Sequence, residues 1–311
     1  MPSNRLPYAT RNIKHYFRRR VVSKLSQNCL KIIVWLALDN KCPGLAQPLG
    51  LWYNRAMHRF LVPAVVLDQK VAVLPGDASR HLKVVRPRSG EEVELFDGKG
   101  SARTYRVDLA SGAPVLSAAG AVRRLPPMPF DLALFACVTK GSRWDWTIEK
   151  AVELGVSRIV PVISARCIVR LPTAERAAKA ERWRRIAADA ARQSDAVWLP
   201  EVDEAVDFPD ALAKIRNFGR VFAGALTDPV SPPLWKVLSE AVAGGQAGRS
   251  RLGIFVGPEG DFTPEELQAV LQVATPVSFG PTILRAETAA IFGISVLAAA
   301  GAGFVADRTS G

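Results

Sequence analysis

The chain has 311 residues, of which 49% are hydrophobic and 23% are charged, the composition of an ordinary globular protein with room for two domains. Its four cysteines form no C-x-x-C pair and its three histidines are dispersed, so neither a disulfide framework nor a metal cluster is predicted. We interpret Cys137 and Cys167 as buried, inert thiols. The formal net charge of +12 is uneven: residues 1–56 carry ten basic and one acidic side chain, residues 57–127 eleven and seven, and residues 128–311 twenty and twenty-one. The mildly basic segment 57–127 suits contact with RNA phosphates.

Residues 1–56 form a basic N-terminal extension for which three interpretations stay open. The segment is translated upstream sequence with Met57 as the true start, which we favour, or an Arg-rich transit peptide, or a basic RNA-binding tail. Its apolar run Ile32–Leu38 is too short to span a membrane as a helix. We expect this segment to be disordered or poorly packed.

Short β-type runs separated by turn signals predict a small β-barrel domain at residues 57–125. The expected strands are Phe60–Leu67, Lys70–Leu74, Glu91–Phe96, Thr104–Leu109 and Val115–Ala118. The turn sequence D-G-K-G at residues 97–100 predicts a hairpin, and Ala78–Val85 is a short helix candidate. A proline-rich linker at residues 126–130 follows.

From residue 131 to residue 305, strand and helix patterns alternate, which predicts an α/β domain with a mostly parallel sheet covered by helices on both faces. The expected strands are Leu132–Val138, Arg158–Ile163, Arg220–Leu226, Leu252–Val256 and Val277–Phe279. The expected helices are Trp144–Leu154, Ala174–Gln193, Pro233–Val242, a helix that begins with a capping box at Thr263, and Glu287–Ala300.

Two glycine-containing loops near the C-terminus each follow an apolar strand and lead into a helix. The first is Gly257-Pro258-Glu259-Gly260, and the second runs from Gly280 to Arg285. Ligands of open α/β sheets bind where strand ends meet such loops and helix N-termini. Neither loop matches the dinucleotide or P-loop pattern, so the sequence predicts a small-molecule site of another kind.

The paired motifs GPEGDF and ILRAETAA resemble those of the SPOUT methyltransferases, and most closely the bacterial family that methylates uridine N3 in 16S ribosomal RNA of the small subunit. Further ordered motifs support the resemblance over roughly residues 57–305: MHRFLVP at 57–63, HLKVVR at 81–86, GEEVELFDG at 90–98, KGSR at 140–143, IEKAVELGV at 148–156, SARC at 164–167 and AARQS at 190–194. The chain departs from the family at Asp261, where a glycine or another small residue is usual.

This resemblance implies a deep trefoil knot in the parallel sheet, a PUA-like N-terminal RNA-binding domain and a cytoplasmic homodimer. It also implies S-adenosylmethionine as the methyl donor, with no metal. The residues implied to bind the cofactor are Leu226, Thr227, Gly257, Pro258, Glu259, Gly260, Gly280, Ile283, Leu284, Arg285 and Thr288. For catalysis, Arg285 is expected to stabilise charge on the uracil or hold a phosphate. Glu287 accepts the N3 proton or only caps the last helix, and these two interpretations stay open.

The residues expected to contact RNA are Arg59, His81, Lys83, Arg86, Lys140, Arg143 and Arg166, although each is also interpretable as a solvated surface charge. Trp144, Trp146 and Trp198 either stack on bases or pack in the core, and the core is favoured for Trp146. Two other functions stay open: a different SPOUT specificity such as ribose 2′-O-methylation, and an RNA-binding protein without catalysis.

Overall fold

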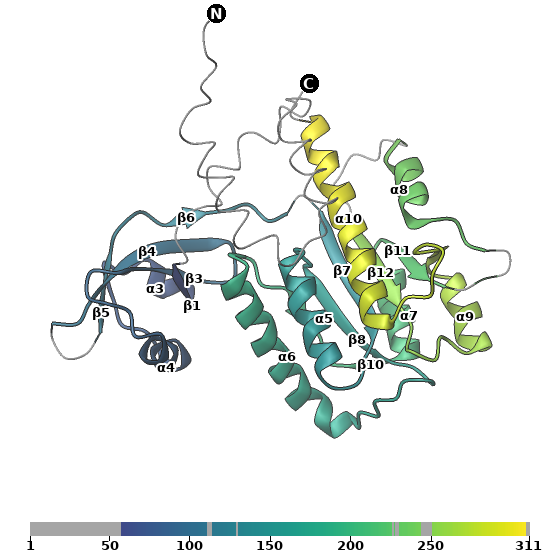
Figure 1. Cartoon of the computed structure of the whole chain (residues 1–311), viewed down its shortest axis with the longest axis horizontal. Helices are drawn as coiled ribbons and strands as arrows, with labels where there is room; N and C mark the ends of the chain where they lie inside the picture. The colour runs from purple at the N-terminus through teal and green to yellow at the C-terminus, as the bar shows by residue number, and fades with distance from the viewer. Residues whose placement is uncertain are drawn as a thin grey trace, which may run out of the picture. The chain divides into compact units, whose positions relative to one another are not determined.

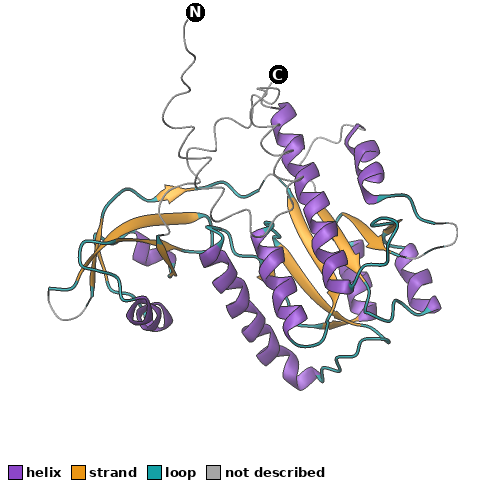
Figure 2. Cartoon of the chain, viewed as in Figure 1, coloured by secondary structure: helices purple, strands orange, loops and turns teal. Residues whose placement is uncertain are grey.

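The computed structural model describes residues 57–110, 114–128, 130–225, 227, 230–243 and 251–308, with the side chains of 239–243 and 301–308 left out. The predictions for residues 1–56 and for Leu226 lie outside the described residues. Contacts group the described residues into one compact unit that starts at Met57. Figure 1 labels its elements, and Figure 2 separates strands from helices by colour.

The N-terminal module is a six-stranded sheet with two short helices, α3 and α4. Its strands pair in the order β1-β3-β4-β5-β2, with β6 on β4; only β1 and β3 are parallel. The elements are β1 His58–Leu61, α3 Ala64–Leu67, β2 Val71–Ala72, α4 Gly76–Val85, β3 Glu92–Phe96, β4 Ser101–Asp108, β5 Val115–Ala118 and β6 Arg123–Arg124.

Two predictions in this module are wrong. The strand predicted at Phe60–Leu67 ends at Leu61, and the turn α3 begins after Pro63, a residue that has no N–H for a strand ladder. Residues Arg123–Arg124, for which no strand was predicted, pair with β4 as β6. The hairpin predicted at D-G-K-G is confirmed, because β3 and β4 are antiparallel neighbours.

The C-terminal module is a seven-stranded sheet in which every pairing is parallel. Its strand order is β10-β8-β7-β12-β11-β13, with β9 on β8. The strands are β7 Asp131–Cys137, β8 Arg158–Ile163, β9 Glu201–Val202, β10 Val206–Asp207, β11 Arg220–Gly224, β12 Arg251–Val256 and β13 Thr275–Val277. The helices are α5 Ser142–Glu153, α6 Thr173–Gln193, α7 Phe208–Arg216, α8 Leu234–Ala243, α9 Pro264–Leu271 and α10 Ala286–Arg308.

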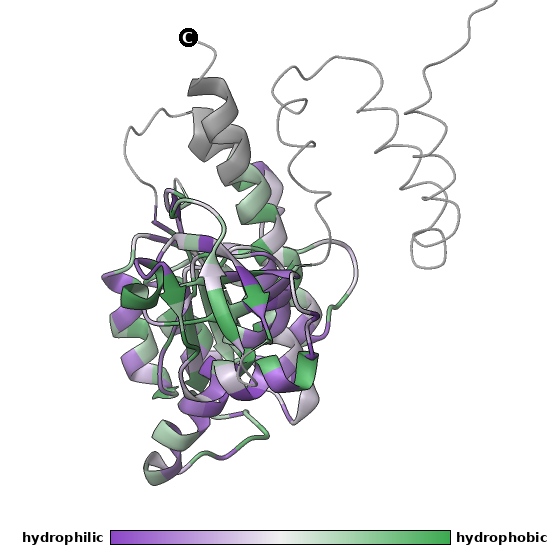
Figure 3. Ribbon diagram, turned by 90° about the vertical axis from the view of Figure 1, so that its left-hand side faces the viewer, coloured by the Kyte–Doolittle hydropathy of each residue, from purple (hydrophilic) through white to green (hydrophobic). Residues whose placement is uncertain are grey.

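Helices cover both faces of this sheet, as predicted. On one face, strand residues such as Leu134 and Ile254 pack with buried residues of α5, α6, α8 and α10. On the other, alternate residues such as Phe135 and Phe255 pack with α7 and α9. Green, hydrophobic residues accordingly run along the strands in Figure 3. The α/β fold is therefore confirmed, while the trefoil knot stays a prediction.

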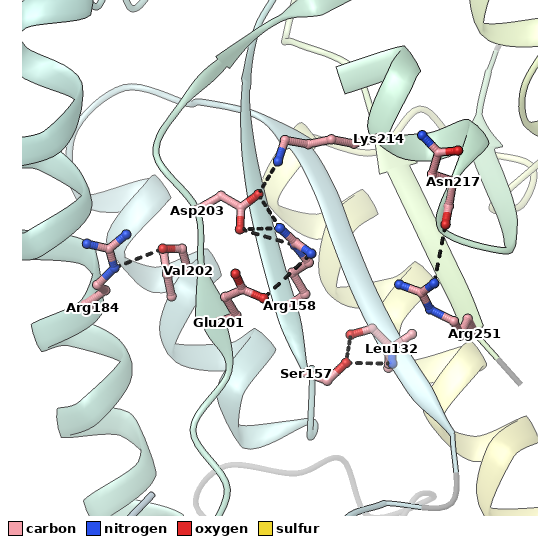
Figure 4. Close-up of polar contacts among 10 residues, drawn as sticks. All are labelled: Leu132, Ser157, Arg158, Arg184, Glu201, Val202, Asp203, Lys214, Asn217 and Arg251. Atoms are coloured by element: carbon pink, nitrogen blue, oxygen red, sulfur yellow. Dashed lines mark hydrogen bonds and ion pairs between the residues drawn. The ribbon is translucent and has the colours of Figure 1, made fainter. Parts of the chain in front are cut away.

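Polar contacts fix the amino edge of the sheet. Asp203, whose side chain is 8% exposed, accepts hydrogen bonds from Arg158 at 2.9 to 3.2 Å and from Lys214 at 2.9 Å (Figure 4). Arg158 also lies 3.6 Å from Glu201, so the charges of this cluster balance one another. An open hollow of about 530 Å³ lies beside them and is lined by residues of β8, β9, α6 and α7.

Candidate functional site

The two glycine loops meet at the carboxyl edge of the parallel sheet, the edge opposite the Asp203 cluster. Gly224, the last residue of β11, pairs with Val256 of β12 and with Val277 of β13, so these three strands end side by side. The segments that follow them contain Thr227, the loop at 257–262 and the loop at 278–285. The structure thus brings together the three segments in which cofactor-binding residues were predicted.

The first loop is a tight turn whose residues are held from within. The Asp261 amide donates to the Pro258 carbonyl at 2.9 Å, and the Asp261 carboxylate accepts from the Phe262 amide at 2.8 Å. Asp261 has φ +59°, a left-handed conformation that glycine adopts freely and aspartate tolerates better than most residues. This conformation explains why a glycine would fit there and why Asp261 still forms the turn. Beside it, a Cβ on Gly257 would come within 3.1 Å of the Phe262 ring.

Three side-chain contacts tie this loop to its neighbours. Arg166 donates to the carbonyls of Gly260 and Phe262 at 3.0 and 3.1 Å. Arg143, from α5, lies 3.4 Å from the Glu259 carboxylate. The structure places both arginines against this loop at 257–262, in which cofactor-binding residues are predicted and which is called the cofactor loop below. Their contact with RNA stays a prediction.

The second loop is more open. Gly280 has φ +131°, a conformation that side-chain-bearing residues rarely adopt, and the Ser278 hydroxyl bonds to its amide at 3.2 Å. Ile283 is 84% exposed, Leu284 is half-buried and Arg285 is exposed. On the neighbouring segment, the hydroxyl of Thr227 lies 2.6 Å from that of Ser231. An apolar side chain as exposed as Ile283 beside glycine backbone is the type of surface that a ligand covers.

Three buried polar atoms at this edge have no hydrogen-bond partner among the described residues. They are Glu287 Oε2 in the first turn of α10, Trp144 Nε1 in the first turn of α5 and Thr139 Oγ1 two residues after β7. Buried polar atoms without partners are rare and usually point to a missing ligand, water or function. Sequence reasoning missed Thr139, whose only signal is its place after a buried parallel strand. Thr288, also predicted, is exposed.

The remaining predicted RNA contacts lie in different environments. Arg59 is 4% exposed and donates to Glu94 at 2.8 Å and to the Ala191 and Ala196 carbonyls at 2.8 and 3.2 Å. This burial argues against an RNA contact, because the side chain joins the two modules instead. His81 packs edge-on against Phe60. Its pKa is lowered, mainly by burial and to a lesser extent by the positive charge of Arg192, so a neutral imidazole is favoured near pH 7. Lys83, Arg86 and Lys140 are exposed as expected.

The tryptophans are arranged differently from the favoured interpretation. Trp146 is 42% exposed, so its predicted core packing is wrong, and Trp144 is the buried one. Trp198 donates its Nε1 hydrogen to the Leu125 carbonyl at 3.1 Å, which leaves its ring 39% exposed. Within the described residues, no three metal-ligating side chains cluster, and no helix has the length and apolar character needed to cross a membrane.

Comparison with known proteins identifies the family. The model of the RNA methyltransferase domain matches residues 126–298, more than half of the chain, and the RNA methyltransferase PUA domain model matches residues 74–111. The chain belongs to this RNA methyltransferase family. The C-terminal module is therefore the methyltransferase domain, and the N-terminal module is its PUA-like companion.

The similarity to known proteins extends over most of both chains. The ribosomal RNA small subunit methyltransferase E of Mycobacterium bovis is 33% identical over 71% of this chain and 83% of its own length. The protein of that name from Synechocystis is 29% identical over 74% of this chain and 73% of its own. Among solved structures, the ribosomal RNA small subunit methyltransferase E of Neisseria gonorrhoeae bound to S-adenosyl methionine has a TM-score of 0.67 at 31% identity and covers 78% of this chain and 96% of its own. A methyltransferase from Legionella pneumophila in complex with the same cofactor has a TM-score of 0.67 at 26% identity, over 78% and 98%.

Proposed function

We propose that this protein transfers a methyl group from S-adenosylmethionine to N3 of a uridine in 16S ribosomal RNA of the small subunit. Membership of the RNA methyltransferase family supports the reaction class. The names of its relatives support the small-subunit RNA as substrate, and the cofactor in two similar structures supports the donor. The atom N3 comes from the motif resemblance, and the site of this chain offers a group suited to it.

The observation that carries the proposal is the unpartnered carboxylate oxygen of Glu287. Uridine N3 bears a proton at neutral pH that must leave as the methyl group arrives, so a nearby proton acceptor accelerates the step. Glu287 Oε2 is buried at the carboxyl edge and accepts no hydrogen bond from a described residue. A side chain that served only as a helix cap would accept bonds from backbone amides of its own first turn.

The residues of the edge fit an adenosyl cofactor. The exposed Ile283 and the half-buried Leu284 offer apolar area for an adenine ring, and the backbone beside Gly280 approaches without a Cβ in the way. The turn at Gly257–Gly260 and the segment at Thr227 would form the walls around the ribose and the amino-acid part. When bound, S-adenosylmethionine supplies a methyl group already activated by a positively charged sulfur.

With the cofactor bound, Glu287 would accept the proton from uridine N3, and the nitrogen electron pair would form the new bond to the methyl carbon. The bond from that carbon to the sulfonium sulfur would break at the same time, so that S-adenosylhomocysteine leaves. Arg285, exposed at the start of α10, stabilises the negative charge that develops on the uracil oxygens. The positive end of α10 favours the same charge. Exclusion of water and alignment of N3 with the methyl carbon supply much of the remaining acceleration.

Surface features support the proposed substrate and assembly. Lys83, Arg86 and Lys140 are exposed cations available to RNA phosphates. Trp235 of α8 is 64% exposed and Phe292 of α10 is 38% exposed, and these helices contact each other. Such aromatic surface favours a second copy of the chain, so we propose a homodimer. Its substrate places the enzyme in the cytoplasm.

The test is methyl transfer from radiolabelled S-adenosylmethionine to small ribosomal subunits prepared from a strain without its own enzyme. Nucleosides are then separated by chromatography. We expect label in 3-methyluridine with the wild-type protein and greatly reduced label with Glu287→Gln. Label in another nucleoside or in a 2′-O-methylated ribose would refute the N3 specificity. An absence of both transfer and cofactor binding would refute the enzymatic assignment.

A further inference from the structure

Two cysteines that are far apart in the sequence meet at one serine beneath the candidate site. Cys137, the last residue of β7, donates to the Ser164 hydroxyl at 3.4 Å. Cys167 lies 3.3 Å from the same hydroxyl, and its sulfur accepts from the Ser164 amide at 3.3 Å. Both thiols are free and buried. The pairing of β7 with β8, in register at Cys137 and Val162, creates this neighbourhood.

The residues on either side of Cys167 in the chain are exposed to solvent. Arg166 and Ile168, the chain neighbours of Cys167, are both exposed, and Ile168 is 61% exposed. Cys167 itself is buried, on a short turn closed by the bond from its amide to the Ser164 carbonyl at 3.2 Å. A small reactant needs only a local opening of this turn to reach the sulfur.

The two thiols differ in pKa, so that one can act as the nucleophile and the other as its partner. Hydrogen bonding with Cys137 and Ser164 lowers the pKa of Cys167 to about 6 despite its burial. Burial raises the pKa of Cys137 well above the ordinary thiol range. Near neutral pH, Cys167 therefore carries the reactive thiolate, and Cys137 carries a proton.

The turn that holds Cys167 also holds the cofactor loop. The Ala165 amide donates to the Glu266 carboxylate at 2.8 Å, and the same carboxylate closes the capping box of α9 with Thr263. Arg166 donates to the carbonyls of Gly260 and Phe262. A displacement of residues 164–167 would therefore move or release three hydrogen bonds to the segment 260–266.

We propose that Cys137 and Cys167 form an oxidative modification site, in which a peroxide converts the two thiols to a disulfide that loosens the cofactor loop. The Cys167 thiolate attacks one oxygen of hydrogen peroxide, the O–O bond breaks, and a sulfenic acid and a hydroxide result. The hydroxide takes up a proton from solvent and becomes the first water. The Cys137 sulfur then attacks the sulfenic sulfur, so that the S–S bond forms and a second water leaves. The two thiols lose two electrons and two protons, and the peroxide is reduced to two waters.

The consequence for the loop follows from bond length. A disulfide requires a sulfur separation of about 2.05 Å, and the Ser164 hydroxyl now contacts both sulfurs. We infer that bringing the two sulfurs to this distance would shift Ser164 and draw the turn at 164–167 toward β7. The contacts from Ala165 and Arg166 to the loop then lengthen. The effect on cofactor affinity rests on the proposed function, whereas the disulfide itself does not.

The test uses the full chain with Cys29→Ser and Cys42→Ser, so that only the two proposed thiols remain. The protein is treated with hydrogen peroxide, its free thiols are alkylated, and tryptic peptides are analysed by mass spectrometry. We expect peptide 125–140 linked to peptide 167–170 with the loss of two hydrogen atoms, reversed by dithiothreitol. Recovery of both peptides alkylated, or of an oxidised but unlinked Cys167, would overturn the proposal.

The functional arm measures S-adenosylmethionine binding by calorimetry before and after oxidation. We expect the Kd to rise about tenfold, which corresponds to about 1.4 kcal/mol, and to return on reduction. The matched control Cys137→Ser should show neither linkage nor a change in Kd. A linked protein with an unchanged Kd would overturn the coupling to the loop. If the reduced protein binds no cofactor, the proposed function fails, and amide exchange of residues 257–266 still decides whether the disulfide loosens the loop.

Discussion

Replacement of Arg166 by alanine should weaken S-adenosylmethionine binding, although the residue does not need to touch the cofactor. Its guanidinium donates to the Gly260 and Phe262 carbonyls at 3.0 and 3.1 Å. A hydrogen bond from a charged donor contributes about 1.5–3 kcal/mol when it is shielded, and less at an exposed site. Because Arg166 is exposed, we expect a loss of about 1–2 kcal/mol for the two bonds together. That loss corresponds to a rise in Kd of about 5- to 30-fold.

Calorimetric titration with S-adenosylmethionine measures this effect directly. Arg166→Lys keeps the charge but lacks the planar fork that reaches two carbonyls, so its Kd should rise by an intermediate amount. Arg185→Ala is the matched control, because among the described residues Arg185 bonds only to the Glu181 carbonyl of its own helix. An unchanged cofactor Kd in Arg166→Ala, together with weaker binding to small subunits, would refute this reasoning and restore the RNA contact predicted from the sequence.

Four other outcomes follow from the structure. Glu287→Gln keeps the shape of the side chain but removes the proton acceptor, so methyl transfer should slow by about 10²- to 10⁴-fold with little change in cofactor Kd; a rate near wild type would leave only the capping role. Gly280→Ala forces a side chain into φ +131°, at a cost of about 1–3 kcal/mol, and calorimetry should show weaker cofactor binding. Asp203→Asn removes the negative charge that pairs with Arg158 and Lys214, whose side chains are about one-third exposed, so we expect about 2 kcal/mol of destabilisation. Calorimetric melting should show a Tm lower by about 4–8 °C, and activity at low temperature should be unchanged. Ultraviolet thiolate absorbance should show a transition with a midpoint at about pH 6 that is absent in Cys167→Ser. Because the pKa of Cys167 is depressed in the folded protein, the thiolate stabilises the fold above the ordinary thiol pKa, and this stabilisation is lost as the pH falls through about 6.

Local patterns determined most of the secondary structure. The strands Val115–Ala118 and Arg158–Ile163 have the predicted bounds, because a short apolar run between turn residues indicates a strand without help from distant segments. The capping box at Thr263 is confirmed in both of its hydrogen bonds. The short helix Phe208–Arg216 was missed, although Pro209 in its first turn is a recognisable start signal.

The identity of the two site loops also came from the sequence alone, because glycine-rich turns after strands and their ordered motifs are local features. The roles of single charged residues did not. Arg59 was expected on the RNA surface, but contacts to Ala191 and Ala196, more than 130 positions away, bury it. Arg166 is a residue type that often contacts RNA. Only the folded chain shows that its guanidinium donates hydrogen bonds to the carbonyls of Gly260 and Phe262.

The sequence by itself thus predicted the α/β class, the order of most elements and the loops of the candidate site, since each depends on periodicity and turn chemistry within a few residues. Only the tertiary structure decided which side chains meet. Strand order sets β7 beside both β8 and β12, and no local pattern encodes that order. This adjacency gathers Cys137, Ser164 and Cys167 into one cluster. At the edge where three strands end, the fold leaves the Glu287 Oε2 atom buried, with no hydrogen-bond partner among the described residues.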